Sequence, residues 1–80
     1  MSALAATPAV EYAPLWAVHS EKDARPSFRA WARSEAEAKK SLAAIRDNDV
    51  EASSTEYWVM QMTMEEVAGY KHAGVLPQDA

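Results

Sequence analysis

Two arginines flank a tryptophan at alternate positions in residues 27–40, which read SFRAWARSEAEAKK. On a β-strand, Arg29, Trp31 and Arg33 would share one face, because strand side chains alternate with a period of two. Arginine and tryptophan are enriched at binding hot spots, and on an open sheet face they can also stack against nucleobases. Together with Tyr57, the row is either a recognition surface or the ordinary outer face of a sheet, partly covered by a C-terminal helix.

Acidic residues in the C-terminal half form a second candidate surface. Six carboxylates contribute to it: Asp47, Asp49, Glu51, Glu56, Glu65 and Glu66. The alternating acids at 47–51 suggest a calcium loop, but such a loop needs glycine at position six and glutamate at position twelve. Ala52 and Trp58 occupy those positions, so calcium is not expected. The acids are therefore either solvated or part of a patch that binds a partner.

No catalytic or metal-binding constellation stands out in the sequence. The chain has no cysteine, and His19 and His72 lack further ligands at the spacing of a zinc site. Its two glycines do not suit a glycine-rich phosphate loop. We therefore predict no catalytic residue, no metal and no cofactor, and interpret the chain as a non-enzymatic interaction protein.

The net charge of −4 is unevenly distributed. Residues 22–46 carry seven cations and three acids, whereas residues 47–80 carry one cation and seven acids. Overall acidity argues against direct binding of nucleic acid, which needs a net basic surface. It favours a protein partner that is itself basic, such as one with a nucleic-acid-binding surface. A small nucleic-acid binder that uses its sheet face is a third, less favoured alternative.

Size and composition indicate one small domain. Eighty residues, 49% of them hydrophobic, support a single core. Such a core supplies only about 3–5 kcal/mol of net stability, so a homodimer or a larger partner would help. The lack of cysteine favours a reducing cytoplasm. No apolar run approaches the ~20 residues that a membrane span needs, and the N-terminus lacks the basic start of a signal peptide.

The spacing of apolar residues predicts elements in the order β-β-α-β-α. Strands are expected at 14–21, 28–33 and 56–63, with a turn at 22–27 between the first two. Helices are expected over 34–47 and 64–74, and each begins with a capping box: Ser34 with Glu37, and Thr63 with Glu66. Gly74 occupies a position where a helix C-terminus favours glycine. We expect a flexible arm at 1–13, one domain at 14–74 and a tail at 75–80.

These elements predict a small ββαβα domain of the α+β class. Its sheet is three-stranded and largely antiparallel, with the helix 34–47 on one face and a short C-terminal helix. The period of two assigns eight residues to an inner face: Trp16, Val18, Phe28, Ala30, Ala32, Trp58, Met60 and Met62. The arginine–tryptophan row and Tyr57 fall on the outer face. The pattern leaves the strand order open.

In size, acidity, lack of cysteine and α+β layout, the chain resembles the small anti-CRISPR proteins of phages and mobile elements. The six acids beside a short ββαβ unit are the basis of the likeness, which includes no shared motif, so no residue role transfers. The resemblance implies an inhibitor in a bacterial host cell that binds a CRISPR effector subunit and blocks access to DNA. The segments PLWAVH, ARSEAEAKKSLAAI and YWVMQM are also similar to the small non-catalytic subunit of phenylacetyl-CoA epoxidase, which implies a structural subunit of a metabolic complex.

Overall fold

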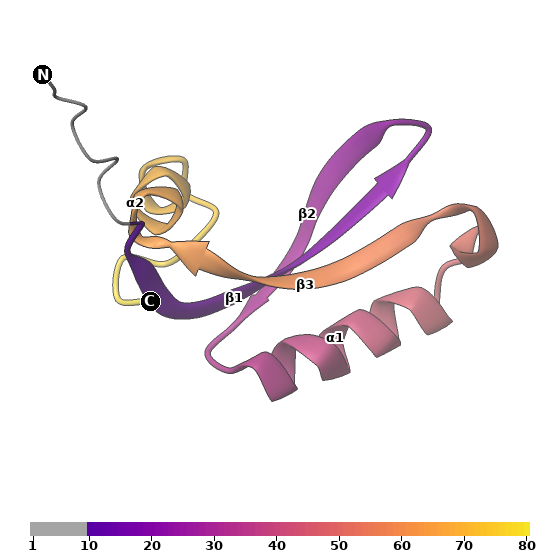
Figure 1. Cartoon of the computed structure of the whole chain (residues 1–80), viewed down its shortest axis with the longest axis horizontal. Coiled ribbons are helices and arrows are strands. Elements are labelled where there is room, and N and C mark those ends of the chain that lie inside the picture. The colour runs from indigo at the N-terminus through magenta and orange to yellow at the C-terminus, as the bar shows by residue number, and fades with distance from the viewer. Residues whose placement is uncertain (1–9) are drawn as a thin grey trace, which may run out of the picture.

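The computed structural model describes residues 10–80 as a three-stranded sheet with two helices (Figure 1). The elements are β1 (Tyr12–Lys22), β2 (Arg25–Ala32), α1 (Glu35–Asp47), the 3-10 turn η1 (Ala52–Ser54), β3 (Glu56–Thr63) and α2 (Met64–His72). The predicted class and element order are both confirmed. Most of the predicted arm, residues 1–9, lies outside the described residues. Within the described part of the chain, no helix combines the length and apolarity needed to cross a membrane.

The strand order is β2-β1-β3, and β1 is antiparallel to both neighbours. Lys22 pairs directly with Arg25, so the β1–β2 hairpin closes through a two-residue turn, Asp23-Ala24. Both turn residues have positive φ, 53° and 61°, as in the type I′ turn that matches hairpin twist. The longer turn predicted at 22–27 is therefore wrong, because its second half is already strand.

A β-bulge in β2 changes which side chains share a face. Val18 pairs with Ala30, but the next residue of β1, His19, pairs with Phe28. Arg29 is thus the extra residue, and a bulge of this kind reverses the alternation beyond it. Phe28 consequently lies on the face opposite Ala30, although the two are separated by an even number of residues.

The helix α1 covers one face of the sheet (Figure 1). Val18, Ala32 and Ala38 are buried beneath it, and the residues packed around them are Trp16, Ala30, Leu42, Ile45 and Val59. Ala38 has no exposed surface, and its small side chain lets helix and strands approach closely. The helix begins after Ser34, whose Oγ accepts a hydrogen bond from the Glu37 backbone N–H at 3.2 Å. The structure shows this half of the predicted capping box.

The helix α2 packs on the opposite face, at the end of the sheet where β3 finishes. The buried residues there are Ala13, Leu15, Ala17, Met62, Val67 and Leu76, with Phe28, Trp31 and Tyr70 packed against them. The capping box predicted at Thr63 is confirmed: its Oγ1 accepts from the Glu66 N–H at 3.0 Å, and Glu66 Oε1 accepts from the Thr63 N–H at 2.9 Å. Ala13 and Leu76 are buried although they lie just outside the expected domain 14–74.

The sheet therefore has two cores, where a single inner face was predicted. Trp16, Val18, Ala30 and Ala32 lie under α1 as expected. The assignment of Phe28, Trp58, Met60 and Met62 to that face is wrong. Val59 of β3 pairs with Val18, so the alternate residues Trp58, Met60 and Met62 face the α2 side. Both sides of β3 are largely apolar, and periodicity could not tell which side met the longer helix.

Candidate functional site

Three rings form a band across the sheet on the α2 face. The His19 ring of β1 stacks on Trp58 of β3, with ring centroids 5.6 Å apart. It also meets Phe28 of β2 edge-on, with centroids 5.8 Å apart. Phe28 in turn lies 4.7 Å from the ring of Tyr70 in α2. His19, Phe28 and Trp58, here called the aromatic band, are half-buried, and Trp58 belongs to neither core.

Two glutamates lie at the hairpin end of the sheet, beside the aromatic band. Glu21 follows His19 by two residues on β1, and Glu56 precedes Trp58 by two on β3, so alternation places both on the band's face. The two glutamates pair directly across the strands, an arrangement in which like charges repel. Within residues 10–80, neither carboxylate takes part in an ion pair. The site therefore combines aromatic surface with two negative charges that lack a cation.

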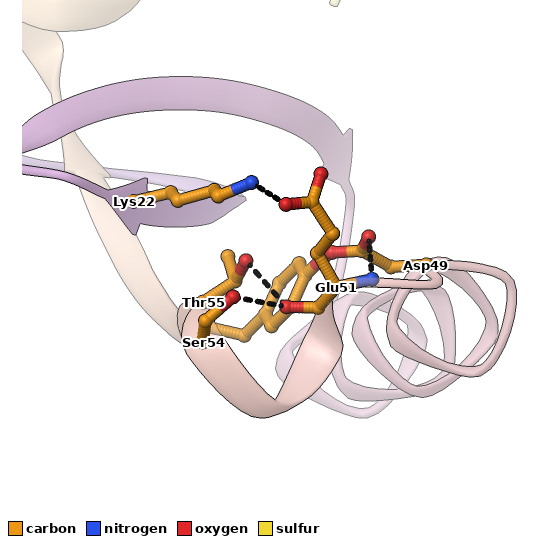
Figure 2. Close-up of polar contacts among 6 residues, drawn as sticks. Lys22, Asp49, Glu51, Ser54 and Thr55 are labelled. Carbon is orange, nitrogen blue, oxygen red and sulfur yellow. Dashed lines mark hydrogen bonds and ion pairs between the residues drawn. The ribbon is translucent and has the colours of Figure 1, made fainter.

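Polar contacts hold the loop after α1 against the hairpin end (Figure 2). Lys22 forms an ion pair with Glu51, and Asp49 Oδ1 accepts a hydrogen bond from the Glu51 backbone N–H at 2.9 Å. The hydroxyls of Ser54 and Thr55 both donate to the Glu51 carbonyl oxygen, each at 3.0 Å. The carboxylate, backbone N–H and carbonyl oxygen of Glu51 therefore all form contacts within the molecule.

Asp49 is also engaged internally, because it accepts a hydrogen bond from the Tyr57 hydroxyl. This bond, followed by the one from the Glu51 backbone, lowers the pKa of Asp49 below its ordinary value. The same bond raises the pKa of Tyr57. The hydrogen bond to Glu51 likewise raises the pKa of Lys22. The hydrogen bond therefore favours the ionised form of Asp49 and the protonated form of Tyr57.

The predicted row of Arg29, Trp31 and Arg33 is divided between the two faces of the sheet. Arg29 lies on the α1 face, where its Nη1 donates to Ser20 Oγ at 3.3 Å and its guanidinium lies 6.0 Å from the Tyr57 ring centroid. Trp31 packs against the α2 core instead. The Arg33 guanidinium lies 4.9 Å from the centre of the Trp31 ring. The bulge at Arg29 causes the division, and coverage of Trp31 by α2 agrees with the plainer interpretation of the row.

The predicted acidic residues are also divided, between the two ends of β3. Asp47, Asp49, Glu51 and Glu56 lie near its start, and Glu65 and Glu66 follow its end. Eight residues of strand separate the groups by about 26 Å. Glu66 caps α2, and Asp49 and Glu51 have the internal partners described above. Asp47, Glu56 and Glu65 are exposed, but the six do not form one patch.

Sequence reasoning missed the aromatic band and the role of Glu21. His19 was interpreted as an isolated surface histidine, and Phe28 and Trp58 as members of the core. The spacing of His19 and Glu21 on β1 was visible in the sequence. What was not visible was the register that brings Glu56 and Trp58 opposite them.

Two open clefts lie on the surface of the described part of the chain. One, of about 440 Å³, lies between the end of α1 and β2 and is lined by Arg29, Ala44, Ile45, Asn48 and Asp49. The other, of about 370 Å³, lies between β1 and α2, with Arg33 and Lys71 among its lining residues. No group of three or more metal-ligating acids and histidines occurs in residues 10–80. Neither cleft brings a nucleophile and a base together among its lining residues.

Comparison of the chain with protein-family models, with curated proteins and with solved structures found no match. Its function is therefore inferred from the aromatic band and the charges around it.

Proposed function

We propose that this protein is a non-enzymatic interaction module that binds a basic segment of a partner protein on the aromatic face of its sheet. The observation that carries the proposal is the direct pairing of Glu21 with Glu56 beside the His19–Trp58 stack. An arginine or lysine side chain placed there would neutralise the repulsion between the two carboxylates. Arginine suits the site best, because its planar guanidinium both stacks on aromatic rings and binds carboxylates with two hydrogen bonds.

The charge of the whole chain supports a basic partner. At a net charge of −4, long-range attraction favours encounter with a positively charged surface. A protein that holds nucleic acid in a basic groove has such a surface. A CRISPR effector subunit is the specific example suggested by the anti-CRISPR resemblance, and occupation of its groove would block access to DNA. The alternative, a structural subunit of a metabolic complex, would use the same face against a basic patch on a larger subunit.

Titration with an arginine-containing peptide tests the proposed site, with tryptophan fluorescence and amide chemical shifts as readouts. The double variant Glu21→Gln/Glu56→Gln should weaken peptide binding by about tenfold or more, because it removes charge-assisted contacts. The matched control is Glu35→Gln/Glu37→Gln in α1, which changes net charge equally and should leave affinity near that of the natural chain. Equal losses in the two double variants would show that only net charge matters and would contradict the proposal.

Four further measurements separate the specific alternatives. In a CRISPR interference assay, the natural chain should restore phage or plasmid survival, and Glu21→Gln/Glu56→Gln should not. Absence of any effect, together with copurification of a large metabolic enzyme, would instead favour the structural-subunit alternative. A gel shift with nucleic acid at low salt would favour the nucleic-acid alternative. If Asp47, Asp49 and Glu51 made the contact, charge reversal there would abolish peptide binding and Glu21→Gln/Glu56→Gln would not.

A further inference from the structure

The two edges of the sheet differ in their protection against pairing with another strand. β2 and β3 are the edge strands, because β1 lies between them. An edge presents unpaired backbone N–H and C=O groups, which proteins commonly block with proline, bulges or charged side chains. β2 has all three: Pro26, the bulge at Arg29, and the charges of Arg25 and Arg29.

β3 has none of these protections along most of its length. Its sequence, EYWVMQMT, contains no proline and one charge, at its first residue Glu56. Its pairing with β1 is regular from Glu56 to Gln61. Aromatic and β-branched residues, which favour extended structure, occupy positions 57–59. The side chain of Met60, in the middle of the strand, is 47% exposed.

Neither helix closes this edge. α2 packs on one face of the sheet over the ends of β1 and β3, where Val67 belongs to a core with Leu15 and Met62. α1 lies across a face of the sheet (Figure 1). Within residues 10–80, β1 is the strand partner of β3. The outward backbone groups of β3 therefore lack a strand partner within the described part of the chain.

We propose that β3 is a dimerisation edge, at which a second copy of this chain pairs antiparallel to form a continuous six-stranded sheet. The two-fold axis of such a dimer is perpendicular to the sheet, so both α1 helices lie on one face and both aromatic bands on the other. Charge favours this edge for a second copy. Pairing through β2 would bring the arginines of two copies together, whereas β3 carries no charge from Tyr57 to Thr63.

The dimer is expected to be weak. Eight residues of strand extend about 26 Å, and the contact consists of one strand pair with its flanking side chains. An interface of that size lies at or below the low end of specific interfaces, about 1,200 Å² of total buried surface. The dissociation constant should accordingly be roughly 10–100 µM.

Sedimentation of the full chain between about 1 and 500 µM, a range that brackets this constant, tests the proposal. The natural chain should change from monomer to dimer. Met60→Lys places a charge at the centre of the edge and should weaken dimerisation by about tenfold or more. Met64→Lys is the matched control, because Met64 is similarly exposed, 49% against 47%, but lies in α2. It should leave the dissociation constant near that of the natural chain.

Hydrogen exchange of the natural chain gives a second test that needs no variant. Backbone amides of β3 should exchange more slowly at high than at low protein concentration, while those of β2 should be unchanged. A monomer over the whole range, protection of β2 instead of β3, or equal weakening by both lysine variants would overturn the proposal. Peptide binding is measured at low concentration, where the chain is monomeric, so loss of either proposal leaves the other standing.

Discussion

The two faces of the sheet are closed to different extents. On one face, the 13-residue helix α1 buries Val18, Ala32 and Ala38 beneath it. On the other, the nine-residue helix α2 covers one end, and the His19–Trp58 stack lies beyond it. One face of the sheet is therefore closed by a helix along its length, and the other combines a core with half-buried aromatic rings and two glutamates. Substitutions at matched positions on the two faces test this contrast.

The largest effect is expected on β3, where Met60 and Met62 share a face and differ in coverage by α2. Met62 is 1% exposed and Met60 is 47% exposed. Met62→Ala should lower the free energy of unfolding by about 2–5 kcal/mol, because it leaves a cavity. Met60→Ala should cost no more than about 0.5 kcal/mol. Urea denaturation followed by circular dichroism measures the free energy of unfolding of both variants. Equal losses would show that Met60 belongs to the core as much as Met62 does.

The α1 face can be tested from the helix side. Ala38 has no exposed surface, so Ala38→Leu should cost about 1–3 kcal/mol by overpacking the contact with the sheet. Ala36→Leu is the matched control, because Ala36 is exposed on the same helix. Thermal unfolding distinguishes the two variants. A tolerated Ala38→Leu would mean that α1 lies less tightly on the sheet than the structure indicates.

The hairpin turn offers a smaller effect of opposite sign. Ala24 has a φ of 61°, a left-handed conformation that costs a non-glycine residue roughly 1 kcal/mol. Ala24→Gly should therefore stabilise the protein by up to about 1 kcal/mol, which raises the melting temperature by roughly 4–8 °C in a domain of this size. Ala36→Gly, the same substitution within α1, should destabilise by about 1 kcal/mol. A loss of stability in both variants would contradict the turn geometry.

The smallest effect is expected at the half-buried pair of Tyr57 and Asp49, and it should depend on pH. The folded pKa of Asp49 is lowered from 3.8, so the stabilisation is present above about that pH and is lost as pH falls through the folded value. The folded pKa of Tyr57 is raised from 10.0, so its contribution is present below that pH and is lost as pH rises through the folded value.

The stability difference between the natural chain and Tyr57→Phe should thus be largest between these limits and shrink at both extremes. Urea denaturation across a pH series measures it. Tyr12→Phe is the control for the loss of a hydroxyl from an exposed tyrosine, because Tyr12 is 57% exposed. A Tyr57→Phe difference that does not change with pH would mean that the hydrogen bond to Asp49 does not persist in solution.

The elements, the starts of both helices and the limits of β3 were predictable because they depend on neighbouring residues. The caps at Ser34 and Thr63 are hydrogen bonds to a residue three positions on, and the limits of β3 follow its alternation at 56–63. The candidate site was not predictable in the same way. Glu56 was named among the acids, but Glu21 and the His19–Trp58 stack lie beside it through pairing of β1 with β3, which are far apart in the sequence.

Local periodicity and short-range hydrogen bonds specify the order ββαβα, the α+β class and the helix caps, so these features could be predicted from the sequence. The face that each strand presents to α1 depends instead on how the strands pair in three dimensions. The bulge at Arg29 divided the arginine–tryptophan row, and the register of β3 on β1 brought Glu56 opposite Glu21. Both depend on pairing between distant residues, and a shift of one position reverses every side chain beyond it. A strand with apolar residues on both sides, such as β3, gives no local signal that decides which of its two faces meets α1.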